Sequence, residues 1–126
     1  MKRIIFVFMA VLLLATGAAL AQEEASIVVT ENTFDFGDIK EADGKVSHAF
    51  TVKNDGAMPL VITRVIASCG CTSPDWTKEP IAPGKTGEVM VTYDPKSRPG
   101  PFAKTVSIYS NGKKGSYAIT IRGNVQ

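Results

Sequence analysis

The chain has 126 residues, with 14 Lys and Arg against 12 Asp and Glu, a formal net charge of +2, and two cysteines. Lys2 and Arg3 account for the excess, so the rest of the chain is neutral and has no basic stripe for nucleic acid or an anionic membrane. The composition therefore excludes a nucleic-acid-binding protein as the first hypothesis.

The N-terminus has the three parts of a secretory signal peptide. Lys2 and Arg3 precede an apolar run over residues 4–15, and the small-residue end is Ala19-Leu20-Ala21. This run is short for a membrane span, which needs about 20 apolar residues, so an uncleaved anchor is the weaker alternative. We expect cleavage after Ala21, a periplasmic or secreted protein, and no stable membrane anchor after cleavage.

Removal of residues 1–21 leaves a mature chain of 105 residues, close to the commonest size of one domain. Residues 22–32 are interpreted as a leader with a possible first strand, in which residues 22–26 are expected to be loose. Residues 33–126 then form one domain.

Short β-rich runs separated by turn residues predict strands along the whole mature chain. The clearest is 45–53, where Val46, His48 and Phe50 alternate with polar or small residues. Residues 60–66 are apolar on both parities, which predicts a central, well-covered strand. The remaining predicted strands cover residues 26–30, 33–37, 88–93, 102–109 and 117–122.

Two further segments are predicted to lack strand structure. A loop is expected through Pro74, Trp76 and Pro80, because proline interrupts a strand interior. Asn111-Gly112 and Gly115 are typical of a hairpin turn between the last two strands. About seven short strands in about 100 residues predict an all-β, immunoglobulin-like sandwich of antiparallel strands, with a barrel as the alternative.

An ordered set of phrases in this chain resembles a known family. The set includes Phe34-Asp35-Phe36-Gly37, Ser68-Cys69-Gly70-Cys71-Thr72, Ile81-Ala82-Pro83-Gly84 and Ile121-Arg122-Gly123-Asn124-Val125. Their order resembles the bacterial family of unknown function DUF1573 over residues 33–125. The resemblance implies an immunoglobulin-like fold akin to major-sperm-protein and ASPM/SPD-2/Hydin type domains, whose members are mostly binding or scaffolding modules. A shared fold does not determine function.

Cys69-Gly70-Cys71 is the motif with the most chemistry in this chain. A disulfide needs Cα atoms about 4.4–6.8 Å apart, whereas two residues of an extended strand span about 6.6–7 Å, so the chain must turn at Gly70 for the sulfurs to join. A ring this small contributes at most about 1.6 kcal/mol through loop entropy. Three interpretations stay open: inert residues ending a core strand, a redox-active pair, or thiolates that bind a soft ion such as Cu(I), with His48 or Met58 as accessory ligands.

His48 and Trp76 are the other side chains of interest. His48 is the only histidine, and its parity predicts a partly buried, hydrogen-bonded side chain rather than a ligand or a base. No nucleophile, base and acid can be assembled around it, so no enzyme activity is expected. Trp76 either covers the end of the sandwich or anchors a partner.

Two functions from different classes follow from these features. The first is a non-enzymatic binding or assembly module of the periplasm or cell envelope, with an unidentified protein partner that could add a strand to a sheet edge. The second is a thiol protein that uses Cys69 and Cys71 for disulfide exchange or soft-metal binding, in a compartment where disulfides persist.

Overall fold

The computed structural model describes residues 24–126; the expected signal peptide and its cleavage site at residues 1–23 lie outside the described residues. The described chain forms eight strands and one short 3-10 helix, η3 (Glu41–Asp43). The strands are β1 (Ile27–Val29), β2 (Thr33–Ile39), β3 (Val46–Asn54), β4 (Ile62–Ala67), β5 (Thr72–Trp76), β6 (Thr86–Tyr93), β7 (Gly100–Ser110) and β8 (Ser116–Val125). Within residues 24–126, no helix is long and apolar enough to cross a membrane.

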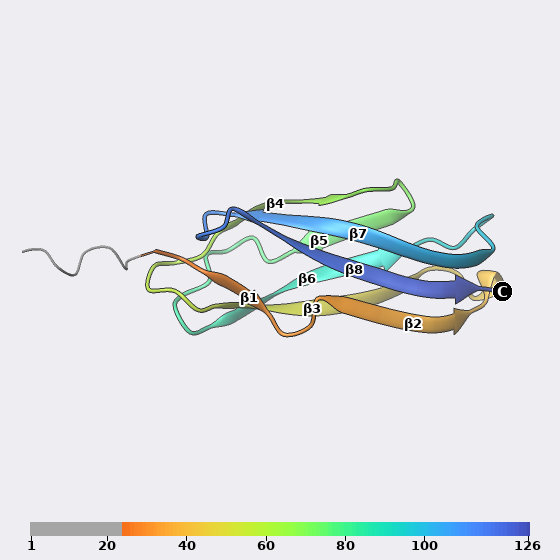
Figure 1. Ribbon diagram of the computed structural model, residues 1–126, viewed down its shortest axis with the longest axis horizontal. Helices are drawn as coiled ribbons and strands as arrows, with labels where there is room; N and C mark the ends of the chain where they lie inside the picture. The colour runs from red at the N-terminus through yellow and green to blue at the C-terminus, as the bar shows by residue number, and fades with distance from the viewer. Residues whose placement is uncertain (1–23) are drawn as a thin grey trace, which may run out of the picture.

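The strands form two four-stranded sheets. Sheet A has the order β1-β3-β6-β5 and sheet B the order β2-β8-β7-β4. All neighbours are antiparallel except β2 and β8, which run parallel. Figure 1 shows the two sheets as stacked layers, with the described chain entering at one end of the long axis and leaving at the other. The predicted immunoglobulin-like sandwich is confirmed, with eight strands rather than about seven, and the barrel alternative is wrong.

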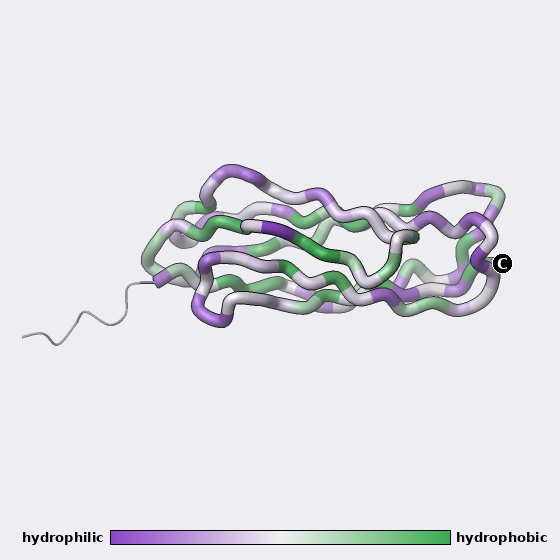
Figure 2. Tube along the Cα trace, turned by 90° about the horizontal axis from the view of Figure 1, so that it is seen from above, coloured by the Kyte–Doolittle hydropathy of each residue, from purple (hydrophilic) through white to green (hydrophobic). Residues whose placement is uncertain are grey.

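The core lies between the sheets and is supplied by alternate residues of each strand. Figure 2 shows this alternation as changes between hydrophobic and hydrophilic colour along the strands. On β3, Phe50 and Val52 are fully buried while Thr51 is exposed, which confirms the alternation predicted for residues 45–53. Near one end, the rings of Tyr93 in sheet A and Phe102 in sheet B stack with centroids 3.9 Å apart.

Asn54 organises the opposite end of the sandwich. It is fully buried, and its Nδ2 donates to the carbonyls of Met58 at 2.7 Å and Ile81 at 2.9 Å. Its Oδ1 accepts from the N–H of Gly56 at 2.9 Å and of Ser26 at 3.4 Å. A single buried amide therefore ties the start of the described chain to the loop after β3 and to the segment before β6.

The expectation of a loose leader is wrong for residues 24–26. Ala25 is only 2% exposed, and the carbonyl of Glu24 accepts from the N–H of Ala57 at 2.9 Å. The carbonyl of Ala25 accepts from the N–H of Lys113 at 3.0 Å. The leader is held because its carbonyls accept hydrogen bonds from the loop after β3 and from the turn between β7 and β8.

Two predictions about strand position are also wrong. The apolar run at residues 60–66 was expected to be central, but β4 is the edge strand of sheet B, and Ile66 on its outer face is 46% exposed. The predicted loop through Pro74 and Trp76 contains β5, the edge strand of sheet A. Proline is tolerated there because an edge strand has hydrogen-bond partners on one side only.

Candidate functional site

Cys69 and Cys71 form a disulfide in the turn that carries the chain from β4 in sheet B to β5 in sheet A. Their Cα atoms are 5.2 Å apart, which is shorter than the spacing of an extended strand and places a turn at Gly70. An added Cβ on Gly70 would meet no atom within 4 Å, so the tip of this turn faces open space.

The two sulfurs have different surroundings. Cys71 is 3% exposed and belongs to the core, whereas Cys69 is half-buried. The N–H of Cys71 donates to Cys69 Sγ at 3.1 Å. Thr72 Oγ1 lies 3.5 Å from Cys71 Sγ, and because a disulfide sulfur carries no proton, the hydroxyl is the donor.

The two suggested accessory ligands do not join the cysteines. His48 lies on β3, separated from β5 by β6; its ring stacks on Phe34 with centroids 3.6 Å apart, and its Nε2 contacts the carboxylate of Glu31. Met58 precedes β4 while the cysteines follow it, so they lie at opposite ends of that strand. No group of three or more His, Cys, Asp or Glu side chains suited to a metal occurs within residues 24–126.

Trp76 closes β5 and packs partly against the core. Lys78 Nζ lies 4.2 Å from the centre of its ring and donates to Asp75 Oδ1 at 2.8 Å. This hydrogen bond from Lys78, the backbone N–H of Trp76 and the Lys78 charge hold the pKa of Asp75 below its ordinary value. The Trp76 ring thus contacts the core and the ammonium group of Lys78.

The free edge of β5 offers no open backbone donor, because its own residues cap or lack the outward N–H groups. The bonds from Asp94 N to Cys71 O and from Thr77 N to Glu88 O flank β5, so the alternate residues 72, 74 and 76 point their backbone away from β6. Thr72 N donates to Cys69 O at 3.1 Å, Trp76 N donates to Asp75 Oδ1 at 2.9 Å, and Pro74 has no N–H.

The free edge of β4 is less protected: its register with β7 shifts once, between Ile62 and Arg64, and residues 64–67 then pair with β7 without a further shift. Ser68 N donates to Thr105 O at 3.2 Å, which fixes the alternation along the ladder with β7, so the backbone of Val65 and Ala67 points outward. Neither outward N–H has a hydrogen-bond partner within the described chain. On the outer face beside them lie Arg64, over the ring of Tyr109 at 4.4 Å, and the exposed Ile66.

The other two edges are short or interrupted. β1 has three residues, and just before it the carbonyl of Ala25 already accepts a hydrogen bond from Lys113 N. The register of β2 shifts between Asp35 and Asp38, and Gly37 N donates to Asp35 Oδ1 at 2.8 Å. Short length and bulges are common ways to protect an edge, so residues 64–67 of β4, which follow its own register shift, are the most open stretch of edge among the described strands.

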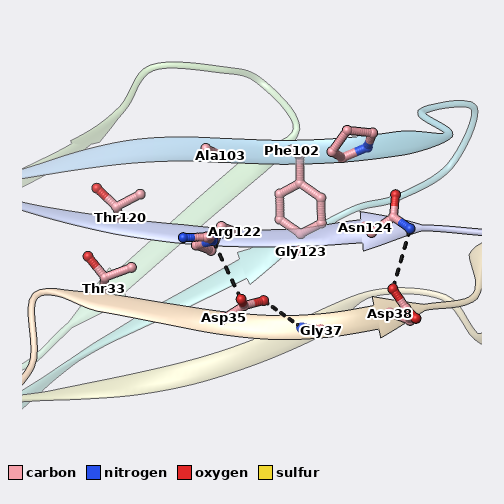
Figure 3. Close-up of a pocket in the computed structure, with 11 residues that line it drawn as sticks. Thr33, Asp35, Gly37, Asp38, Phe102, Ala103, Thr120, Arg122, Gly123 and Asn124 are labelled. Carbon is pink, nitrogen blue, oxygen red and sulfur yellow. Dashed lines mark hydrogen bonds and ion pairs between the residues drawn. The ribbon is translucent and has the colours of Figure 1, made fainter.

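A shallow depression of about 720 Å³ covers the outer face of β2, β8 and β7 (Figure 3). The charged side chains that line it have partners among the lining residues: Arg122 Nε lies 3.5 Å from Asp35 Oδ2, and the neutral amide Asn124 Nδ2 donates to Asp38 Oδ1 at 3.3 Å. The depression is therefore a self-satisfied polar surface and a weaker candidate than the open edge.

The β4–β7 register places Lys104 at the same end of sheet B as Cys69, and the sequence alone did not single out this residue. Ser68 N donates a hydrogen bond to Thr105 O. Cys69 is the residue after Ser68 and Lys104 is the residue before Thr105, so in this antiparallel pair both lie on the same side of that hydrogen bond. Lys104 is half-buried and forms no ion pair within residues 24–126. Along the sequence the basic residues nearest to the cysteines are Arg64 and Lys78, and Lys104 is related to the cysteines only through the β4–β7 register.

Comparison with known families identifies the chain. The model for the family described as a protein of unknown function, DUF1573, matches residues 27–125. The chain belongs to the DUF1573 family. The resemblance read from the sequence is thereby confirmed, with β1 included in the match.

Solved structures similar to this DUF1573 chain share its fold. A protein of unknown function from Porphyromonas gingivalis is 20% identical, with 85% of this chain and 50% of that one covered and a TM-score of 0.70. The seventh PapD-like, or ASH, domain of human CEP192 is 7% identical, with 88% and 93% covered and a TM-score of 0.66. The YadV chaperone is 11% identical, with 80% and 51% covered and a TM-score of 0.54. The chain thus spans half the length of the Porphyromonas protein, and a comparison with curated protein sequences finds no match.

Proposed function

We propose that this DUF1573 protein is an exported binding module of the periplasm or cell envelope, which takes an extended segment of a partner protein as an added strand along β4. The observation that carries the proposal is the contrast between the four edges. On β5 the outward backbone N–H groups are capped or missing, β1 has only three residues, and the register of β2 shifts. On β4, beyond its register shift at Ile62–Arg64, the N–H groups of Val65 and Ala67 have no partner within residues 24–126. Strand addition uses such unpaired backbone groups for affinity.

The side chains beside the edge define the chemistry of the partner. An added strand would pair its backbone with Val65 and Ala67 and place alternate side chains next to Arg64 and Ile66 on the outer face. Arg64 is exposed and has no carboxylate partner within residues 24–126. The preferred segment therefore carries an acidic residue and an apolar residue two positions apart.

The proposal assigns a binding role and no chemical step. Its location rests on the signal-peptide pattern of residues 1–21. The strand-addition mode rests on the edge geometry alone, because the similar solved structures are too distant in sequence to transfer a partner.

The test is a photo-crosslinking amino acid placed at Ile66 in cells that export the full chain. We expect an adduct with a partner protein, identified by mass spectrometry. In Ala67→Pro the outward N–H is removed while the ladder to β7 is untouched, and the adduct is expected to disappear. Ala67→Ser changes the side chain but keeps the N–H, and is expected to retain the adduct.

Far-UV circular dichroism and the urea midpoint establish that Ala67→Pro is folded before its adduct is compared. A folded Ala67→Pro protein that still crosslinks as efficiently as Ala67→Ser would contradict strand addition at β4. Adducts obtained from Met90, on the outer face of sheet A, but none from Ile66 would move the binding surface to the other sheet.

A further inference from the structure

We infer that the Cys69–Cys71 disulfide is a thiol-exchange site, at which the thiolate of a small thiol or of a partner protein attacks Cys69 Sγ. The inference does not depend on strand addition, because it rests on the turn after β4 rather than on the free edge. It concerns stoichiometric exchange with a thiol.

Access selects the sulfur that is attacked. A thiolate must reach one sulfur along a path that leads out to solvent. Cys71 is 3% exposed and packed in the core, whereas Cys69 is half-buried at a turn whose tip, Gly70, faces open space. The N–H of Cys71 also holds Cys69 Sγ in place at 3.1 Å. Cys69 is therefore the electrophilic sulfur.

The surroundings of Cys71 suit the leaving group. Attack at Cys69 releases Cys71 as a thiolate in a buried site, which is unfavourable without a donor. Thr72 is 5% exposed, and the one hydrogen bond of its hydroxyl within the described chain is with Cys71 Sγ, at 3.5 Å. When negative charge develops on that sulfur, a hydroxyl already directed at it becomes a stronger, charge-assisted donor.

Lys104 adds a positive charge at the same end of the sheet. The hydrogen bond from Ser68 N to Thr105 O sets the local register. Cys69, just after Ser68, and Lys104, just before Thr105, are the next pair toward the turn. Lys104 is half-buried and has no carboxylate partner within residues 24–126, and its positive charge favours the approach of an anionic thiolate. Lys104 of sheet B thus attracts the incoming thiolate. Thr72, the first residue of β5, donates a hydrogen bond to the departing Cys71 thiolate.

The exchange balances as a two-step thiol–disulfide reaction. The incoming thiolate forms a bond to Cys69 Sγ, the Cys69–Cys71 bond breaks, and its electron pair goes to Cys71 Sγ, which then takes a proton from solvent. When the reactant is a dithiol, its second thiolate attacks the sulfur joined to Cys69. Cys69 then leaves as a thiolate, so the dithiol is oxidised and the protein pair is reduced by two electrons.

The experiment uses the mature protein and reduced glutathione under native conditions, with acid quenching and mass mapping of the adduct. We expect a mixed disulfide on Cys69, with far-UV circular dichroism unchanged. Cys71→Ser, mixed with oxidised glutathione, is expected to retain glutathione on Cys69, whereas the matched Cys69→Ser variant leaves the buried Cys71 unmodified. Thr72→Val keeps the shape of the side chain and is expected to slow exchange about tenfold, the size expected for losing a charge-assisted hydrogen bond.

Several outcomes would overturn the inference. One is a wild-type disulfide that withstands glutathione in the native state but is reduced in urea, since access would then require unfolding. Glutathione found mainly on Cys71 would reverse the roles assigned to the two sulfurs. An unchanged exchange rate in Thr72→Val would show that the Thr72 hydroxyl does not stabilise the leaving thiolate. Mapping on the wild type needs no variant to fold, and Ile66 crosslinking tests strand addition separately.

Discussion

Gly123 on β8 lies beneath the ring of Phe102 on β7, which in turn stacks on Tyr93 of the other sheet. An added Cβ at Gly123 would come within 2.8 Å of Phe102 Cζ and 3.0 Å of the carbonyl of Gly37. The ring cannot move freely, because Tyr93 is packed against it. We expect Gly123→Ala to lower the free energy of unfolding by roughly 1–3 kcal/mol, measured by urea denaturation.

Gly70 supplies the matched control for this prediction. Its position has open space around the added methyl group and no positive φ, so Gly70→Ala is expected to stay within about 0.5 kcal/mol of the wild type. Equal stability losses in the two variants would show that the contact between Phe102 and Gly123 is not the cause.

Tyr93 gives the protein a pH dependence in alkaline solution. Burial raises the pKa of its phenol above the ordinary value of 10.0, with Arg98 opposing the shift and Asp94 adding to it. The unfolded chain loses this proton near pH 10 while the folded chain keeps it. The free energy contributed by the neutral phenol is therefore fully present below about pH 10 and is lost as the pH rises through the raised folded pKa.

The prediction for Tyr93 is a falling urea midpoint above about pH 10, with a smaller fall in Tyr93→Phe. Tyr109 and Tyr117 remain in the variant, so they serve as internal controls. The same alkaline slope in both proteins would assign the effect to another group.

At the residue scale, the sequence predicted local geometry better than it predicted partners. The spacing of Cys69 and Cys71 correctly implied a turn at Gly70 if the sulfurs were joined. It could not indicate which sulfur is buried, because that depends on packing between the sheets. The contact of His48 with Glu31 and the position of Lys104 were missed for the same reason: both involve residues on other segments whose register is set by the fold.

Among the elements, β5 shows how proline can mislead a reading of sequence. Pro74 and Pro80 suggested a loop, but the missing N–H of Pro74 lies on the side of β5 that has no neighbouring strand. The proline therefore costs no ladder hydrogen bond, and it removes a donor that another chain could use. β4 was misplaced for a related reason, because apolar residues on both parities do not distinguish an edge strand with an exposed Ile66 from a central one.

Pro74→Ala tests the protective role of this proline. The substitution restores an outward N–H on β5 and is expected to produce concentration-dependent self-association, measured by sedimentation velocity. Pro80→Ala, in the exposed segment after β5, restores an N–H outside the strand and is expected to remain like the wild type. A Pro74→Ala protein with unchanged sedimentation at high concentration would mean that Thr72 and Trp76 close the edge without it.

For the whole molecule, the alternation of residues 45–53 and the turn residues between the runs were enough to predict two packed sheets. The strand order was not predictable at the same level, since alternation shows which side chains face inward but not which strands are neighbours. The parallel pairing of β2 with β8 and the strand at β5 emerge only from the assembled fold.

The segment at residues 24–26 is part of the folded unit, which gives a prediction for truncated chains. It accepts hydrogen bonds from Ala57 and Lys113, and Ser26 accepts from Asp55 at 2.8 Å. Each such bond contributes about 1 kcal/mol, so a chain starting at residue 27 is expected to lose about 3 kcal/mol relative to one starting at residue 22. Equal urea midpoints for the two chains would show that these contacts add nothing.

The parallel pair of β2 and β8 has a mechanical consequence. These strands lie near the two ends of the described chain, which emerge from opposite ends of the long axis (Figure 1). Tension applied through both ends would pull β2 and β8 past each other along their length. It would load the hydrogen bonds between them together instead of opening them one by one. The domain would therefore transmit force with little extension until the whole β2–β8 ladder fails.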